Sequence, residues 1–159
     1  MARGTFKNCR IIIKDATAGT LRVVPMNSLS IVGVTYDEQD LTAWQDAVKN
    51  ALPTMPDAPI EFGGPFDDSA LAAVPNLSGS HTLLNALNGV VAPVSVDVQF
   101  GMDNATWTAG APQFGITATA TSGYILTKYV VDPASMTYSA RLVLYPGSAL
   151  PAWGTAAET

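Results

Sequence analysis

Short stretches in which apolar and polar residues alternate recur along this chain, and such alternation predicts β-strands with one buried face. In 94–100 (VSVDVQF) every second residue is apolar, and 113–121 shows the same period of two. Further strands are expected at 123–131 and 136–145, with turn residues between them. Regularly spaced strands of this kind are typical of a β-sandwich or barrel.

The first third of the chain also contains strand patterns. Apolar, β-branched runs at 9–14 and 20–24 flank a short connection that includes Gly19, which predicts a β-hairpin. The stretch 28–36 (SLSIVGVTY) predicts a third strand, and 60–62 begins another. Pro25 is expected to mark a strand end because proline cannot donate a ladder hydrogen bond.

One amphipathic helix is expected at about 38–52. Four apolar residues recur there at a spacing of three or four, namely Leu41, Trp44, Val48 and Leu52. Asp37 is suited to the N-cap, and Pro53 would stop the helix. This apolar stripe is interpreted as packing against a sheet, with Trp44 as a ligand platform as the alternative. A second, short helix is predicted at 80–87.

The predicted fold is therefore mainly β, a β-sandwich or barrel with one flanking α-helix at about 38–52 and extended terminal arms. The length of 159 residues fits a single domain, 1–159, with its own hydrophobic core. Residues 1–8 are expected to form an N-terminal arm. Residues 146–159 lack periodicity and are expected to form an irregular C-terminal arm that docks on its own domain or on a neighbour.

Charge changes this picture in one respect. The chain has only 8 basic and 13 acidic residues, and its mean hydropathy is +0.22, so we expect weakly polar surface that a partner protects. Five of the basic residues fall within the first 22 positions, while the remainder is acidic. This asymmetry either brings neighbouring subunits together or is the polar face of a basic strand. A nucleic-acid arm is not favoured, because stacking aromatics are scarce there.

Residues that commonly perform catalysis or hold metals are few. The single histidine, His81, lies beside two serines, but no nucleophile elbow or orienting acid accompanies it, so we expect a capping or packing role. The single cysteine, Cys9, precedes a strand and is expected to be a plain buried thiol, not a reactive one. We predict no catalytic, cofactor-binding or metal site, and no enzyme activity.

Other candidate sites have simpler interpretations. Asp67 and Asp68 lack the alternating pattern of a calcium loop and are expected to serve turns and helix caps. The sequence gives no reason to place Glu61 opposite Asp97 as a glycosidase pair. Sequons at 76–78 and 104–106 are expected to be chance matches because the chain shows no secretion signal, and no apolar run predicts a membrane span.

Three segments resemble small phage virion proteins, and above all the tail tube subunits of long, non-contractile phage tails. They are 61–69 (EFGGPFDDS), 78–84 (SGSHTLL) and the late strand 136–145. The resemblance implies a β-sandwich or barrel with a flanking helix. It also implies six copies per ring, and rings stacked into a tube through which DNA passes.

On this reading the protein is a structural tail tube subunit of the virion, assembled in the host cytoplasm. Its partners would be further copies of itself in stacked hexameric rings and other phage tail proteins. Genomic DNA would pass through the lumen without specific binding, because an acidic wall repels phosphates. Strand faces rich in Ser, Thr and Gln are suited to line an aqueous channel.

Two alternatives remain open from the sequence. A capsid decoration protein or head-to-tail connector would bind a shell or another ring without polymerising. A carbohydrate-binding β-sandwich module would use exposed Trp107 or Trp153 as a stacking platform.

Overall fold

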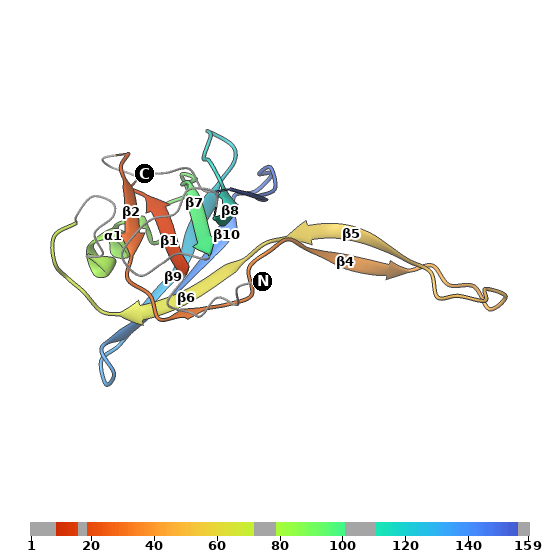
Figure 1. Cartoon of the computed structure of the whole chain (residues 1–159), viewed down its shortest axis with the longest axis horizontal. Coiled ribbons are helices and arrows are strands. Elements are labelled where there is room, and N and C mark those ends of the chain that lie inside the picture. The colour runs from red at the N-terminus through yellow and green to blue at the C-terminus, as the bar shows by residue number, and fades with distance from the viewer. Residues whose placement is uncertain (1–8, 16–18, 72–78, 101–110, 156–159) are drawn as a thin grey trace.

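Two antiparallel sheets face each other across one hydrophobic core, and a long hairpin projects from one side (Figure 1). The computed structural model describes residues 9–15, 19–71, 79–100 and 111–155. The five-stranded sheet has the order β11 (Ala152–Thr155), β8 (Pro112–Ile116), β7 (Val96–Phe100), β1 (Cys9–Lys14) and β2 (Leu21–Val24). The four-stranded sheet has the order β3 (Ser28–Leu29), β6 (Ile60–Pro65), β10 (Thr137–Leu144) and β9 (Tyr124–Asp132).

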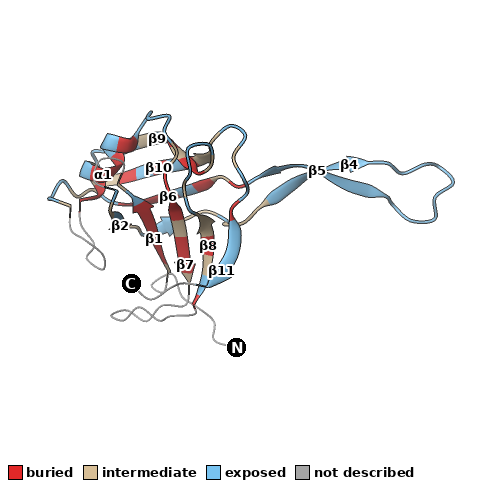
Figure 2. Cartoon of the chain, turned by 90° about the horizontal axis from the view of Figure 1, so that it is seen from above, coloured by how far each residue is buried: buried red, intermediate tan, exposed pale blue. Residues whose placement is uncertain are grey.

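The core lies between the inner faces of the two sheets, as the buried residues in Figure 2 indicate. Both sheets and the helix α1 (Ser80–Leu87) contribute apolar side chains to it, among them Ile11, Val98, Leu84, Phe62 and Leu142. Two buried tyrosines hydrogen-bond backbone carbonyls: Tyr124 donates to Ala58 over 2.8 Å, and Tyr138 donates to Pro25. The architecture is mainly β, as the alternating pattern predicted.

Several predicted elements match the structure closely. The hairpin at 9–24 is β1 paired with β2, where Ile12 lies opposite Val23. The alternation in 94–100 gives β7, in which Val96 and Val98 are fully buried while Asp97 lies on the other face. The short helix predicted at 80–87 is α1, the one helix of the described residues.

The strand predicted at 28–36 is interrupted after two residues. Ser30 donates its amide to the Glu61 carbonyl (2.7 Å), but Glu61 donates its amide to the Ser30 hydroxyl (2.9 Å), so a side chain replaces a backbone acceptor where β3 ends. Gly33 then adopts φ +148°, which does not continue a strand. The chain becomes extended again only at Thr35, on a different pair of strands. The strand predicted at 113–121 similarly ends at Ile116.

The helix predicted at about 38–52 is wrong. These residues belong to a β-hairpin of β4 (Thr35–Asp40) and β5 (Ala51–Asp57), joined by a loop at 41–50. Local side-chain bonds explain the difference: Asp40 accepts a hydrogen bond from the Thr42 amide, and Asp46 accepts one from the Ala43 amide. Such bonds compete with helical hydrogen bonding. The apolar residues of the predicted stripe are exposed and pack against no core.

The two expected terminal arms differ in outcome. Residues 1–8 lie outside the described part of the chain. Within 146–159, which was expected to be irregular, Ala152–Thr155 form the edge strand β11, and Trp153 lies opposite Phe114 of β8. An aromatic contact therefore anchors this segment to the sheet: the Trp153 ring lies 5.1 Å from that of Phe114 and 5.6 Å from that of Phe100.

Candidate functional site: interaction surfaces

The projecting hairpin, residues 35–57, is the most unusual surface of the molecule. It extends away from the body in both views, and all of its residues are exposed (Figures 1 and 2). An isolated two-stranded hairpin in water is only marginally stable. The only sheet partner of β4 is β5, so in the described residues this ribbon gains no support from the two larger sheets.

The tip loop of the hairpin, residues 41–50, is held by hydrogen bonds between its own residues. Asp46 Oδ2 accepts bonds from the Ala43 amide (2.8 Å) and from Asn50 Nδ2 (2.9 Å). Thr42 Oγ1 accepts from the Asn50 amide (2.8 Å), and Leu41 donates its amide to the Asn50 carbonyl (2.9 Å). The loop is therefore organised before it meets any partner.

Apolar side chains protrude from this organised loop. The Trp44 side chain is fully exposed to solvent, and Val48 is 73 % exposed. Large aromatic residues held in a rigid loop are typical anchors of protein interfaces, because little conformational entropy is lost when they are buried. The tip therefore has the character of an interface anchor, not of a core element.

The hairpin is also strongly acidic. It carries one basic residue, Lys49, and five carboxylates, which are Asp37, Glu38, Asp40, Asp46 and Asp57. Hydrogen bonds from Thr42 hold the pKa of the Asp40 carboxyl below its usual range. A partner of the hairpin should therefore offer positive charge in addition to an apolar contact.

Proline shapes the edges of the hairpin. Pro53 and Pro56 lie on β5, opposite Glu38 and Tyr36 of β4. Proline has no amide hydrogen, so β5 lacks a backbone donor at each of these two positions. Extension of the hairpin by strand addition along β5 is therefore disfavoured, and contact through its side chains is favoured.

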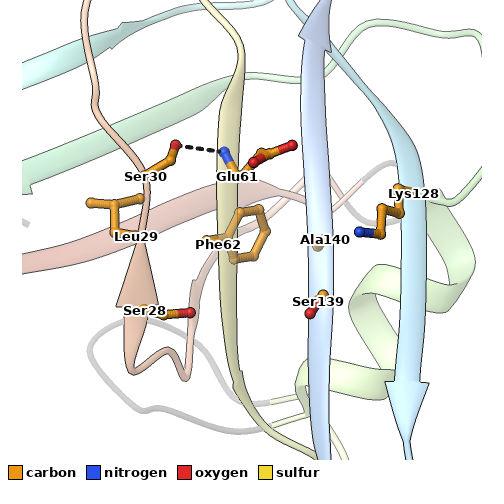
Figure 3. A pocket seen from close by; sticks show the side chains of 8 residues that line it. All are labelled: Ser28, Leu29, Ser30, Glu61, Phe62, Lys128, Ser139 and Ala140. Atoms are coloured by element: carbon orange, nitrogen blue, oxygen red, sulfur yellow. Dashed lines mark hydrogen bonds between the residues drawn. The ribbon is translucent and has the colours of Figure 1, made fainter.

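The outward face of the four-stranded sheet forms a second surface, shown in Figure 3. We call it the outer sheet face, and its described residues include Ser28, Ser30, Glu61, Lys128, Asp132, Ser139 and Arg141. A shallow hollow of about 310 Å³ lies on it, with Phe62 and Ala140 among its lining residues. Glu61 and Lys128 point toward β10 from either side (Figure 3).

Glycine keeps this hollow open. Gly63 lies between Ser28 and Ser139 in the strand register. A Cβ at Gly63 would lie 2.7 Å from the Tyr138 carbonyl oxygen and 2.9 Å from Ser28 Oγ, so the position tolerates no side chain. Around the hollow, Arg141 and Glu61 form an exposed ion pair (3.5 Å), and Lys128 lies opposite Arg141 on β9. Asp132, opposite Thr137, lies on the same face, which therefore carries two cations and two carboxylates.

A third polar feature crosses β1, β7 and β8 on the face of the five-stranded sheet away from the shared core. Arg10 Nε donates to Gln99 Oε1 (2.7 Å), Gln99 Nε2 donates to Gln113 Oε1 (2.7 Å), and Gln113 Nε2 donates to Asp97 Oδ1 (3.1 Å). Burial raises the pKa of the Asp97 carboxyl to about 6 and lowers the pKa of Arg10 to about 10. We call this chain of bonds the polar row.

His81 has the packing role expected from the sequence. Its Nδ1 lies 2.9 Å from the Tyr129 hydroxyl, and its ring stacks at a tilt on Phe66 (4.9 Å between centroids). The neighbouring Ser80 hydroxyl donates instead to the Pro65 carbonyl and accepts from the Asp67 amide. The structure therefore does not pair His81 with Ser80 as a nucleophile, and Ser78 lies outside the described residues.

Asp67 performs the turn and cap chemistry predicted for it. Its carboxylate accepts hydrogen bonds from the Ser69 amide and from the Gly79 amide just before α1, both over 2.9 Å. The bonds from Ser69, together with that from Gly79, hold the pKa of Asp67 below its usual range. Asp68 is exposed beside it.

The remaining candidates from the sequence have plain outcomes. Cys9 is partly buried at the start of β1, and burial raises the pKa of its thiol. Glu61 lies on the outer sheet face, whereas Asp97 lies in the polar row of the other sheet, so the two do not form a carboxylate pair. Trp107 and both sequons fall outside the described residues, and Trp153 is 57 % exposed beside its aromatic neighbours.

The described residues contain no candidate metal site and no candidate membrane-spanning helix. Within them, no three His, Cys, Asp or Glu side chains gather closely enough to hold a metal ion. No helix among the same residues is long and apolar enough to cross a bilayer.

Comparison with solved structures places this fold among components of phage-like tails. A chain of the sheath/tube terminator of the PVC extracellular contractile injection system matches with a TM-score of 0.56 and 14 % identity, over 97 % of this chain and 98 % of that one. The tube-terminating cap of the anti-feeding prophage matches with a TM-score of 0.57 and 13 % identity, over 98 % and 93 %. A chain of the PVC sheath–tube complex matches with 0.56 and 13 %, over 97 % and 93 %.

These likenesses extend over nearly the whole chain, and at such low identity they establish a shared fold. No protein-family model matches the sequence. No curated protein matches it either. The expected relation to tail proteins is thus supported at the level of the fold. The three structures come from contractile injection systems, whereas the sequence resemblance had indicated non-contractile tails.

Sequence reasoning missed the two surfaces that the structure makes prominent. The hairpin was hidden by a helical spacing of apolar residues, and Pro53 was interpreted as the end of a helix although it lies within β5. The outer sheet face depends on the pairing of four strands that are distant in sequence, and no local pattern announces it.

Proposed function

We propose that this chain is a structural, non-enzymatic subunit of a phage-like tail tube, in which six copies form a ring and rings stack into a tube. The observation that carries this proposal is the projecting hairpin, whose residues are all exposed and whose tip holds apolar side chains in an organised loop. Such an element has a physical reason to exist only if neighbours cover it. The likeness to tail components supports the same conclusion.

The proposal includes the partners and the place of action. Further copies of this chain and other tail proteins would be its partners, in the virion tail after assembly in the host cytoplasm. DNA would pass through the lumen without specific binding, because the formal net charge of −5 repels phosphates.

A second candidate is a terminator that closes the end of a tube as a single ring. The names of two structural neighbours favour it, since one is a sheath/tube terminator and the other a tube-terminating cap. The two candidates differ in the particles they predict. A tube subunit alone forms hollow tubes of variable length, whereas a terminator forms discrete rings.

Deletion of the hairpin tests the assembly proposal. Residues 36–56 would be replaced by a short Gly-rich turn, which leaves both main sheets intact because β4 and β5 pair only with each other. We expect the variant to keep its thermal unfolding transition and to sediment as a monomer under conditions in which the full chain assembles. Assembly of the deleted variant at the wild-type concentration would contradict the proposal.

A further inference from the structure

Asn88 and Gly89 form the exposed junction at which α1 ends. Asn88 is the C-cap and donates its amide to the Leu84 carbonyl (3.0 Å), and Gly89 follows with φ +77°. Both residues are exposed to solvent. An asparagine that precedes glycine is especially prone to spontaneous deamidation, because glycine has no side chain to hinder attack by its own nitrogen. The sequence contains this pair only here.

The reaction consumes only water. The Gly89 nitrogen, after losing its proton, bonds to Asn88 Cγ, and the bond from Cγ to the side-chain nitrogen breaks so that ammonia leaves. Water then opens the resulting ring at either of its two carbonyls. One product has aspartate at position 88, and in the other, isoaspartate, the main chain passes through Cβ. No oxidant or reductant is needed.

Two features of the fold restrain this reaction. Gly89 donates its amide to the Leu126 carbonyl on β9 (3.1 Å), so its nitrogen keeps the proton that it has to lose. The ring closes only when the Gly89 nitrogen eclipses Cβ of Asn88, whereas at the observed ψ of 121° that nitrogen eclipses the Cα hydrogen. The C-cap must therefore open and rotate before the new bond forms.

The contact between α1 and β9 controls this opening. The two elements lie side by side (Figure 2). Gly89 bonds β9 at the end of the helix, and His81 Nδ1, near the start of the helix, lies 2.9 Å from the Tyr129 hydroxyl. Local opening at the end of an element costs less free energy than unfolding of the whole domain. Separation of α1 from β9 should therefore set the rate.

We propose that Asn88–Gly89 is a site of spontaneous deamidation, that the contact between α1 and β9 restrains it, and that the modification weakens this contact. Aspartate adds a negative charge at the C-terminal end of α1, where the helix dipole is already negative. Isoaspartate lengthens the main chain, which displaces the Gly89 amide from the Leu126 carbonyl. A modified chain therefore holds the end of α1 less firmly than a new one.

Peptide mapping by mass spectrometry tests the site. The full chain is incubated in a mildly alkaline buffer beside a synthetic peptide of residues 86–92, and deamidation at position 88 is followed over time. We expect product at Asn88 in both samples, with a rate in the folded chain roughly tenfold or more below that in the peptide. Asn50, which is exposed but precedes alanine, is the internal control and should stay unmodified.

Tyr129→Phe tests whether the contact between α1 and β9 is the restraint. The substitution removes the hydroxyl that faces His81 Nδ1 and keeps the ring. Deamidation at Asn88 should become about threefold faster, and hydrogen exchange of the Gly89 amide should rise with it. Tyr36→Phe, on the exposed hairpin, is the matched control and should leave both rates unchanged.

Three results would overturn the inference. If position 88 of the folded chain stays unmodified long after the peptide has reacted completely, it is not a modification site. Equal rates in the folded chain and the peptide would show that the fold does not restrain the reaction. Unchanged deamidation and exchange in Tyr129→Phe would exclude the contact between α1 and β9 as the restraint. None of these results depends on self-association, so the proposed function is tested separately.

Discussion

The Asp97 carboxyl illustrates how one side chain links fold and pH. It ends the polar row and accepts a hydrogen bond from Gln113, yet burial raises its pKa from 3.8 to about 6. Between these two pH values the folded chain holds a proton that the unfolded chain has lost. The contribution of Asp97 to stability is therefore present at pH below about 4 and is lost as pH rises to about 6.

Asp97→Asn should remove this pH dependence. The amide oxygen can still accept from Gln113 Nε2, while no charge has to be buried. We expect the variant to be more stable than the parent at pH 7, by about 1 kcal/mol because the carboxylate keeps partial contact with water, and nearly equal at pH 4. Urea unfolding at both pH values measures the difference. A parent chain that gains stability between pH 4 and 6 relative to the variant would contradict this account.

Gly115 is a glycine whose missing side chain matters. It lies opposite Asp97, and an added Cβ would overlap the Val96 carbonyl oxygen and the Asp97 carboxylate. Gly115→Ala should therefore lower the free energy of unfolding by about 1–3 kcal/mol. Gly154→Ala on β11, where no atom lies within 4 Å of the added Cβ, is the matched control and should be neutral. Equal transitions for the two variants in thermal unfolding would count against the register in which β7 and β8 pair.

The residue-level roles were partly predictable from sequence. His81 and Asp67 were expected to pack and to cap because no catalytic partners stood near them, and both do so. The polar row could not be foreseen, since Arg10 and Gln99 are 89 positions apart and meet only through strand pairing. A local sequence pattern shows which face of a strand is exposed to solvent. It does not show which strands pair, and therefore not which polar side chains become neighbours.

The secondary-structure elements were also only partly predictable from the sequence. Strands such as β1 and β7 were predictable because their alternation matches burial on one side of a sheet. The helix predicted at 38–52 is absent, because apolar residues three or four positions apart indicate a helix only where a core buries them. Here the stripe residues are exposed on a hairpin, and short-range bonds of Thr42, Asp46 and Asn50 shape the loop instead.

Asp46 should control the order of the tip loop. Asp46→Ala removes the acceptor for the Ala43 amide and for Asn50 Nδ2. We expect faster amide hydrogen exchange at 42–50, with no change in the exchange of β1 or β7, because the loop is remote from the core. Gln45→Ala, a neighbouring exposed position, is the control. Unchanged exchange in the Asp46 variant would show that its carboxylate does not hold the loop.

The molecule as a whole combines a stable body with an element that the body does not support. The sandwich buries one continuous core contributed by both sheets and α1, whereas the hairpin stands outside it. The hairpin leaves apolar side chains such as Trp44 and Val48 exposed, although it also carries five carboxylates.

The central claim is that the chain assembles with copies of itself. Negative-stain electron microscopy of the purified, concentrated protein at moderate salt tests this most directly. We expect hollow tubes or rings of constant diameter, and the distribution of their lengths separates a tube subunit from a terminator. Uniform small particles of monomer size, at every protein concentration and salt tried, would contradict the account.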